Sequence, residues 1–275
     1  MTRGSIFEIG PTLQQWRVAR LGPVSDVQAP GRIAALVIRS ALAVFLAVVL
    51  WRALYAGTTD ESGLSRDQAV TFMVLASLLT GTRMSNRWIA GDTVVQRMQS
   101  GTILYWFLRP ISPRRYYFVR GMGELGYGHL WLIIGFVICL AARVITPPAP
   151  GMAPAALASL VLSDAIFYQV NLLLDLLCFW TVVNQSAIQI MFFIQTLLAG
   201  GFAPLWFFPD WFITASGFLP FQGMLNTPIS LYIGRISASA AVGELVVQAG
   251  WLLALWLLSR WLWGHAARRV TVQGG

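Results

Sequence analysis

The sequence predicts an all-α integral membrane protein, and three observations support that fold class. First, 57% of the 275 residues are hydrophobic and only 11% are charged, which is far from the balance of soluble domains. Second, apolar stretches recur at about the 20-residue length that crosses a bilayer as a helix. Third, all 19 basic residues are arginine and flank these stretches, which suits topology and anionic lipid better than nucleic acid. We therefore expect a single membrane domain over residues 1–275, with membrane lipid and no nucleic acid as a partner.

The N-terminal segment, residues 1–33, is expected to lie in the cytoplasm or at the membrane interface. Prolines interrupt it, and Leu13, Trp16 and Val18 alternate with arginines. This pattern favours a short helix on the membrane surface. A mobile tail is the alternative.

We expect six transmembrane helices after this segment. The second is the weakest, because its apolar part is short and Arg83, Asn86 and Arg87 crowd its end. A proline-rich connection separates the third span from the fourth, and a very short turn separates the fourth from the fifth. The predicted spans are residues 34–55, 68–87, 122–145, 155–183, 187–203 and 242–263.

The arginines also predict the orientation, because cytoplasmic loops collect positive charge. Most of them precede the first span, lie between spans two and three, or follow the last span. Arg66, Arg143 and Arg235 lie on the opposite side. We therefore expect a multi-pass protein of the cell membrane with both termini in the cytoplasm.

Between spans two and three, residues 89–120 are expected to form a cytoplasmic region that contains an amphipathic helix. Gly101 can start this helix, and Arg109-Pro110 ends it. Its apolar face consists of Ile103, Leu104, Phe107 and Leu108. On the residues alone, such a helix fits either a groove on another protein or the lipid surface.

Span four carries a polar stripe whose members are spaced by four, three and four residues and so share one helix face. They are Asp164, Tyr168, Asn171 and Asp175. Charge in hydrocarbon is unfavourable, so the stripe should face other spans or a wet cavity. It could line a transport route or carry protons, but we favour a packing role between helices.

The packing interpretation names candidate partners for both carboxylates. Arg143 lies at the depth of Asp164, and Arg120 or Glu124 of span three could approach Asp175. The two carboxylates are about 16 Å apart along the helix. They cannot form a catalytic carboxylate pair.

Between spans five and six, residues 204–235 cannot form one continuous helix, because four prolines interrupt them. Aromatic residues are dense there and charges are few. Amphipathic rings are favoured at the bilayer interface, so we expect a re-entrant helical hairpin on the outer side.

The remaining polar residues form no recognisable catalytic or metal-binding motif. Glu124 and His129 point to different helix faces, and a lone histidine there is expected to be a hydrogen-bonded structural residue. Neither Cys139 nor Cys178 has the spacing of a metal site. A Walker A loop requires lysine, and the sequence contains none. We therefore expect no ATPase site, metal or other cofactor in this chain.

The order of these segments resembles the six-span permease subunits of type-2 ATP-binding-cassette (ABC) exporters. The resemblance rests on two motifs, the inner GTILYWFLRPISPRRYYFVRGMGE and the outer GGFAPLWFFPDWF followed by LPFQGMLNTPISLYIG. The sequence looks closest to a bacterial subgroup whose permeases are often encoded as a pair of related subunits with one separate ATPase.

The resemblance implies that the inner helix docks on ABC ATPase subunits, which would bind ATP and Mg. The coupling residues would be Gly101, Ile103, Leu104, Phe107, Leu108, Arg109 and Pro110. A second permease subunit, related or identical, would enclose a route with this one. The outer hairpin would gate that route through Pro204, Trp206, Phe208, Pro209, Trp211, Pro220 and Phe221.

The implied function is export of an amphipathic or hydrophobic substrate, such as an antibiotic, lipid, peptide or glycolipid. The chain itself would be a transport subunit and not an enzyme. The alternative function is a membrane-embedded, lipid-modifying enzyme that uses intramembrane carboxylates. That enzyme would act without ATP.

Overall fold

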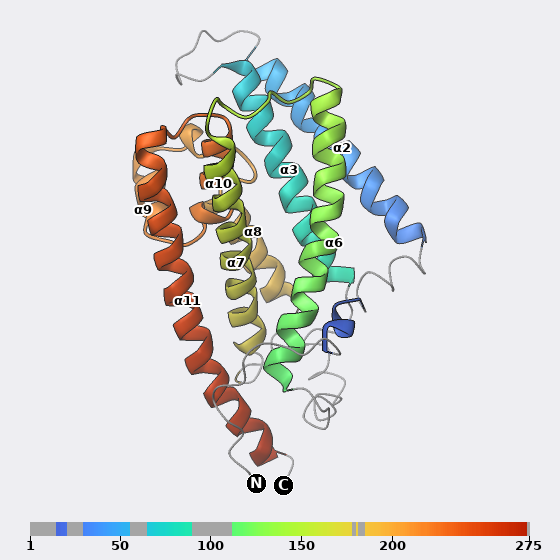
Figure 1. Cartoon of the computed structure of the whole chain (residues 1–275), viewed down its shortest axis with the longest axis vertical. Coiled ribbons are helices and arrows are strands. Elements are labelled where there is room, and N and C mark those ends of the chain that lie inside the picture. The colour runs from blue at the N-terminus through green and yellow to red at the C-terminus, as the bar shows by residue number, and fades with distance from the viewer. Residues whose placement is uncertain are drawn as a thin grey trace.

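A computed structural model describes residues 15–20, 30–55, 65–89, 112–177, 180 and 185–273. Within these ranges the chain is helical and contains no strand. Consecutive long helices run in alternating directions, and several short helices gather at one end of the bundle (Figure 1). The long helices are α2 (Pro30–Leu54), α3 (Arg66–Ile89), α6 (Pro113–Ala141), α7 (Ala153–Leu177), α8 (Gln185–Leu198) and α11 (Ala238–Gln273).

Four of these helices, α2, α6, α7 and α11, are long and apolar enough to cross a membrane. The protein is therefore a multi-pass membrane protein with a helical fold. Helices also occupy the second and fifth predicted spans, but α8 is short and α3 is less apolar than the other long helices.

Helix α3 is less apolar because it packs inside the bundle, against α2, α6 and the hairpin helix α10 (Asn226–Tyr232). Phe72 and Val74 are fully buried. A helix surrounded by protein can carry polar groups, provided that its neighbours pair with them. Thr71 illustrates this, since its hydroxyl accepts a hydrogen bond from the backbone N–H of Thr146 at 3.0 Å.

The third span begins earlier than predicted. Helix α6 starts at Pro113, whereas the expected start was residue 122, and it ends at Ala141 rather than 145. Proline is well accommodated in the first turn of a helix, where its missing N–H would have no intrahelical partner. Residues 113–120 are therefore part of helix α6, and Arg120 is buried.

The fourth span ends as a regular helix at Leu177. Of the predicted remainder, 178–183, only residue 180 is described, so the predicted end at 183 lies outside the described residues. The proposed coupling helix, 101–110, also lies outside them.

The N-terminal segment contains a short 3-10 helix, η1 (Gln15–Arg20), that packs on α6. The contact is close, because a Cβ atom at Gly123 would lie 2.0 Å from the carbonyl oxygen of Ala19. This part of the N-terminal segment therefore packs against α6 on one side, while Trp16, Arg17 and Arg20 are exposed. Leu13 lies outside the described residues.

Residues 204–235, called the hairpin below, form short helices in place of one span. They are η2 (Leu205–Phe207), α9 (Asp210–Gly217), η3 (Gln222–Met224) and α10 (Asn226–Tyr232). Glycines with positive φ flank these short helices: Gly200, four residues before the hairpin, at 81°, and Gly234, near its end, at 76°. Most other residues would be strained at these positions. The hairpin lies at the end of the bundle where α6 ends and α7 begins (Figure 1).

We predict that Gly123→Ala detaches η1 from α6, because the added methyl group meets backbone and not a flexible side chain. Cleavage by trypsin after Arg17 and Arg20 in detergent micelles should become faster. Gly126→Ala is the matched control, since a Cβ atom there meets nothing within 4 Å. Equal cleavage rates in both variants would contradict the packing of η1.

Candidate functional site

The hairpin is joined to the long helices by a largely buried group of polar side chains, called the charged cluster below. Its side chains are Arg83 of α3, His129 of α6, and Ser163 and Asp164 of α7, together with the carbonyl group of Met224 in η3. Asp164 lies near the middle of α7. The charged cluster is therefore at mid-depth in the bundle, far from either end of α7.

Arg83 makes most of the contacts in the charged cluster. Its Nε and Nη2 atoms donate to Oδ1 of Asp164 at 3.1 and 2.6 Å. Nη2 also donates to Ser163 at 2.7 Å, and Nη1 donates to the Met224 carbonyl at 2.8 Å. The guanidinium group lies over the ring of Phe167, 5.0 Å from its centroid. A buried guanidinium needs this number of partners, because an unpaired charge in low dielectric is strongly unfavourable.

His129 approaches the other oxygen of the same carboxylate. Its Nε2 atom lies 2.8 Å from Oδ2 of Asp164, and its Nδ1 atom lies 2.8 Å from the carbonyl oxygen of Leu125. A carbonyl oxygen only accepts hydrogen bonds, so Nδ1 is the donor there. When protonated, the ring forms an ion pair with Asp164. His129 thus joins α6 to α7, a role that its lone position in the sequence did not indicate.

The partner expected for Asp164 was wrong. Arg143 lies after α6 with an exposed side chain and a positive φ of 54°, whereas Arg83 and His129 occupy both carboxylate oxygens. Arg83 had been assigned to the cytoplasmic end of span two. In the structure Arg83 is buried within the bundle, where Asp164, Ser163 and the Met224 carbonyl surround it.

The other members of the polar stripe also lie inside the bundle. Asn171 and Asp175 are 8% and 4% exposed. Tyr117 of α6 donates a hydrogen bond to Asp175, and the amide of Asn171 donates to the carbonyl of Phe167 at 2.7 Å. Tyr168 packs so close to α6 that a Cβ atom at Gly121 would lie 2.7 Å from its ring.

Glu124 of α6 forms an ion pair with Arg120 on the same helix, at 2.9 Å. The two carboxylates of the polar stripe, in contrast, contact groups on other helices. Asp164 accepts from Arg83 of α3, and Asp175 accepts from Tyr117 of α6. These contacts join α7 to α3 and α6, as a packing role requires.

Two glutamines attach the backbone of the hairpin to the long helices. Gln248 of α11 accepts from Ser159 at 2.8 Å and donates to the carbonyl of Gly223 at 2.8 Å. Gln68 of α3 donates to the carbonyl of Ile233 at 2.9 Å. Sequence reasoning missed both residues, because nothing in the pattern around a single glutamine identifies a partner distant in sequence.

The predicted gate residues divide into an inner and an outer group. Trp206 packs edge-on against Phe72 of α3, with ring centroids 4.9 Å apart, and Arg235 lies over its other side. Pro204 and Pro220 are buried. The outer group is exposed or half-buried and consists of Phe208, Pro209, Trp211 and Phe221.

Phe207, which the sequence analysis did not select, makes the contact between the hairpin and α2. Its ring centroid lies 5.0 Å from that of Trp51 and 6.2 Å from that of Tyr55. Aromatic pairs at these separations stabilise by about 0.5–1.5 kcal/mol beyond the area that they bury. The hairpin therefore touches α2, α3, α7 and α11 through separate contacts.

One family model, described as ABC-2 family transporter protein, matches residues 41–274 of the chain. The match covers the charged cluster, the polar stripe and the whole hairpin. No curated protein and no solved structure matches the chain.

We predict that Asp164→Ala lowers the free energy of unfolding by about 3–5 kcal/mol, because it leaves Arg83 buried without its carboxylate. The measurement is the thermal midpoint of the purified protein in detergent. Replacing both partners, as in Arg83→Met with Asp164→Leu, should restore part of the loss. Asp67→Ala is the control, since its pair with Arg66 is exposed and should contribute little. Similar midpoints for Asp164→Ala and Asp67→Ala would contradict this prediction.

Proposed function

The chain belongs to the ABC-2 family of transporter proteins, and from that premise we propose that it is the permease subunit of an ATP-driven exporter. Members of this family are the membrane component of an ABC transporter and have no ATPase site of their own. The family match over most of the chain carries the proposal. We further propose six spans, with both termini in the cytoplasm and the hairpin on the outer face.

The arrangement of the bundle supports a docking site for an ABC ATPase at the end opposite the hairpin. Helix α3 runs toward that end and α6 begins there (Figure 1). The proposed coupling residues, 101–110, lie in the chain between these two helices. Helix η1 packs on α6 and would lie beside the docked ATPase. ATP and Mg would bind to that partner chain.

A second permease subunit, related or identical, is proposed to contact α2 and α8. Large apolar side chains on both helices are more than half exposed in the single chain, including Ile38, Phe45, Ile190 and Phe193. Such surfaces suit either lipid or another apolar helix.

Buried polar groups favour the seam between α3 and α8 as part of the transport route. Among the described residues, the hydroxyl of Thr80 and both amide atoms of Gln195 are buried without a hydrogen-bond partner. Both residues border a cavity of about 20 Å³ that Arg83 also lines. Buried polar groups need partners, so we infer that water, cargo or the second subunit supplies them.

The proposed cargo is an amphipathic or hydrophobic molecule, such as an antibiotic, lipid, peptide or glycolipid. The hairpin would close the outer end of the route. ATP binding, by drawing two ATPase subunits together, would move the permeases relative to one another and open it. The alternative, a lipid-modifying enzyme, would retain activity without ATP.

We predict that Leu104→Asp uncouples ATP turnover from transport, because it places a charge on the face proposed to dock on the ATPase. Thr102→Asp is the control, since Thr102 lies outside that apolar face. Both variants should insert normally. The measurement is ATP hydrolysis and cargo movement in liposomes that contain the complete transporter. Unchanged coupling in Leu104→Asp would count against the assigned docking site.

Co-purification tests the assembly itself. The tagged chain, extracted from native membranes in mild detergent, should bring down an ATPase with Walker motifs and a second permease chain. A differently tagged copy of the same chain distinguishes an identical from a related second subunit. Isolation of the chain with no ATPase would overturn the proposed function.

A further inference from the structure

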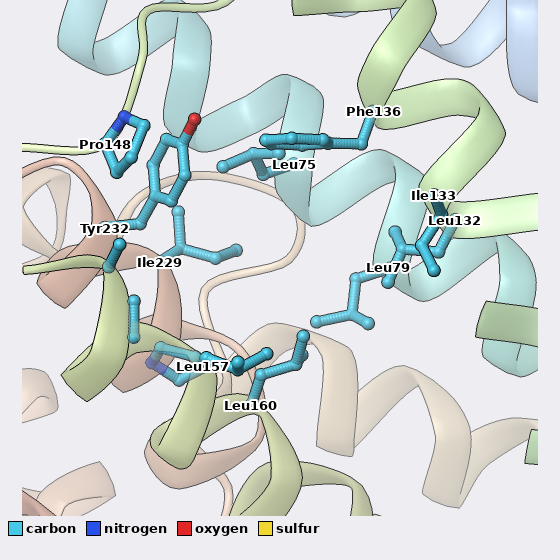
Figure 2. A pocket seen from close by; sticks show the side chains of 13 residues that line it. Leu75, Leu79, Leu132, Ile133, Phe136, Pro148, Leu157, Leu160, Ile229 and Tyr232 are labelled. Carbon is cyan, nitrogen blue, oxygen red and sulfur yellow. The ribbon is translucent and has the colours of Figure 1, made fainter. Parts of the chain in front are cut away.

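An apolar cavity lies between α3, α6, α7 and α10. Its volume is about 380 Å³, within the range of ligand pockets in proteins. Figure 2 shows Leu75 and Phe136 on one side, Leu157 and Leu160 on the opposite side, and Ile229 and Tyr232 closing a third.

The lining excludes a polar ligand. Leucine, isoleucine, alanine, proline and aromatic side chains form the walls, and none of the lining residues carries a charge. Water enters a cavity when polar groups can bond to it, whereas apolar cavities stay dry and accept hydrocarbon ligands. The chemistry of the walls therefore selects a hydrocarbon.

The cavity opens where α6 and α7 face the membrane. Ile133 of α6 and Leu157 of α7 line it and are 57% and 64% exposed. On the same helices, Val137 and Val161 are also exposed and apolar. Acyl chains of the bilayer thus have direct access to the cavity from the side.

The dimensions match one acyl chain and not a whole lipid. Along α7 the lining extends from Ala153 to Leu160, which is about 10 Å at the helical rise per residue. One leaflet contributes about 15 Å to the hydrocarbon core. An acyl chain that enters from the leaflet nearest the hairpin would therefore have most of its own length inside the cavity.

The end nearest the hairpin suits the glycerol region of such a lipid. Pro148, in the connection between α6 and α7, and Tyr232 line this end. The hydroxyl of Tyr232 donates to the carbonyl of Thr146 at 2.9 Å, so the ring presents its apolar part to the cavity. Tyrosine is favoured at this depth of a bilayer.

We propose that this cavity binds one acyl chain of a resident membrane phospholipid. The lipid would lie against α10 of the hairpin, in a cavity that shares no lining residue with the one bordered by Thr80 and Gln195. Because the two cavities are lined by different residues, a lipid bound here would be a structural ligand and not cargo. This inference does not depend on the direction of transport or on the identity of the cargo.

The test uses the full-length protein in nanodiscs that contain a phosphatidylcholine with a photoactivatable diazirine in one acyl chain. After illumination, peptide mass spectrometry locates the cross-links. We expect them to concentrate on the lining segments 132–136 and 157–160. Equal labelling of the lining and of other lipid-facing surfaces, such as α11, would overturn the proposal.

Cavity-filling variants provide the second arm. Ala156→Phe and Ala153→Phe should each abolish labelling of the lining, because both residues border the cavity. Ala153 is exposed, so its variant should fold even where Ala156→Phe does not. Ala158→Phe is the matched control, since Ala158 of the same helix is exposed and does not line the cavity, and it should keep the labelling. Labelling of the lining that persists in a folded filling variant would overturn the proposal. Labelling that appears only when the ATPase and ATP are present would also overturn it, because a resident lipid binds without them.

Discussion

The structure depends on one buried interaction, the contact of Arg83 and His129 with the two oxygens of Asp164. Charges at mid-depth in a bilayer are unfavourable unless other protein groups pair with them. Here the pairing draws α3, α6 and α7 together. Because Arg83 also donates to the Met224 carbonyl, the same interaction holds the hairpin on the bundle.

The two ends of the bundle differ in structure. At one end, the hairpin is attached by Gln68, Gln248 and the aromatic contacts of Trp206 and Phe207. At the other end, where α6 begins, the segment between α3 and α6 is proposed to dock on an ATPase. Helix α3 also borders two cavities, one with unpaired polar groups of Thr80 and Gln195 and one lined by apolar side chains. The difference in lining distinguishes a proposed route from a proposed lipid site.

The early start of α6 and the wrong partner for Asp164 have a common physical cause. Hydropathy measures whether a segment suits lipid and does not detect the groups that pair with an arginine. Arg83, near the end of the predicted second span, and Arg120, just before the third, therefore resemble cytoplasmic arginines in the sequence, although both are buried and paired. Pro113 resembled a helix breaker, although it stands at a helix start, where it is tolerated. Pattern alone does not distinguish a solvated arginine from one whose partner lies on another helix.

The sequence by itself determined the membrane class, the positions of the long helices, the broken hairpin and the inward stripe of α7. These features follow from local composition and helical periodicity, which act within a single segment. Only the tertiary structure decided which groups meet: Arg83 with Asp164, Phe207 with Trp51, and four helices around an apolar cavity. Such contacts join residues far apart in the chain. Their geometry depends on how whole helices cross, which no single segment encodes.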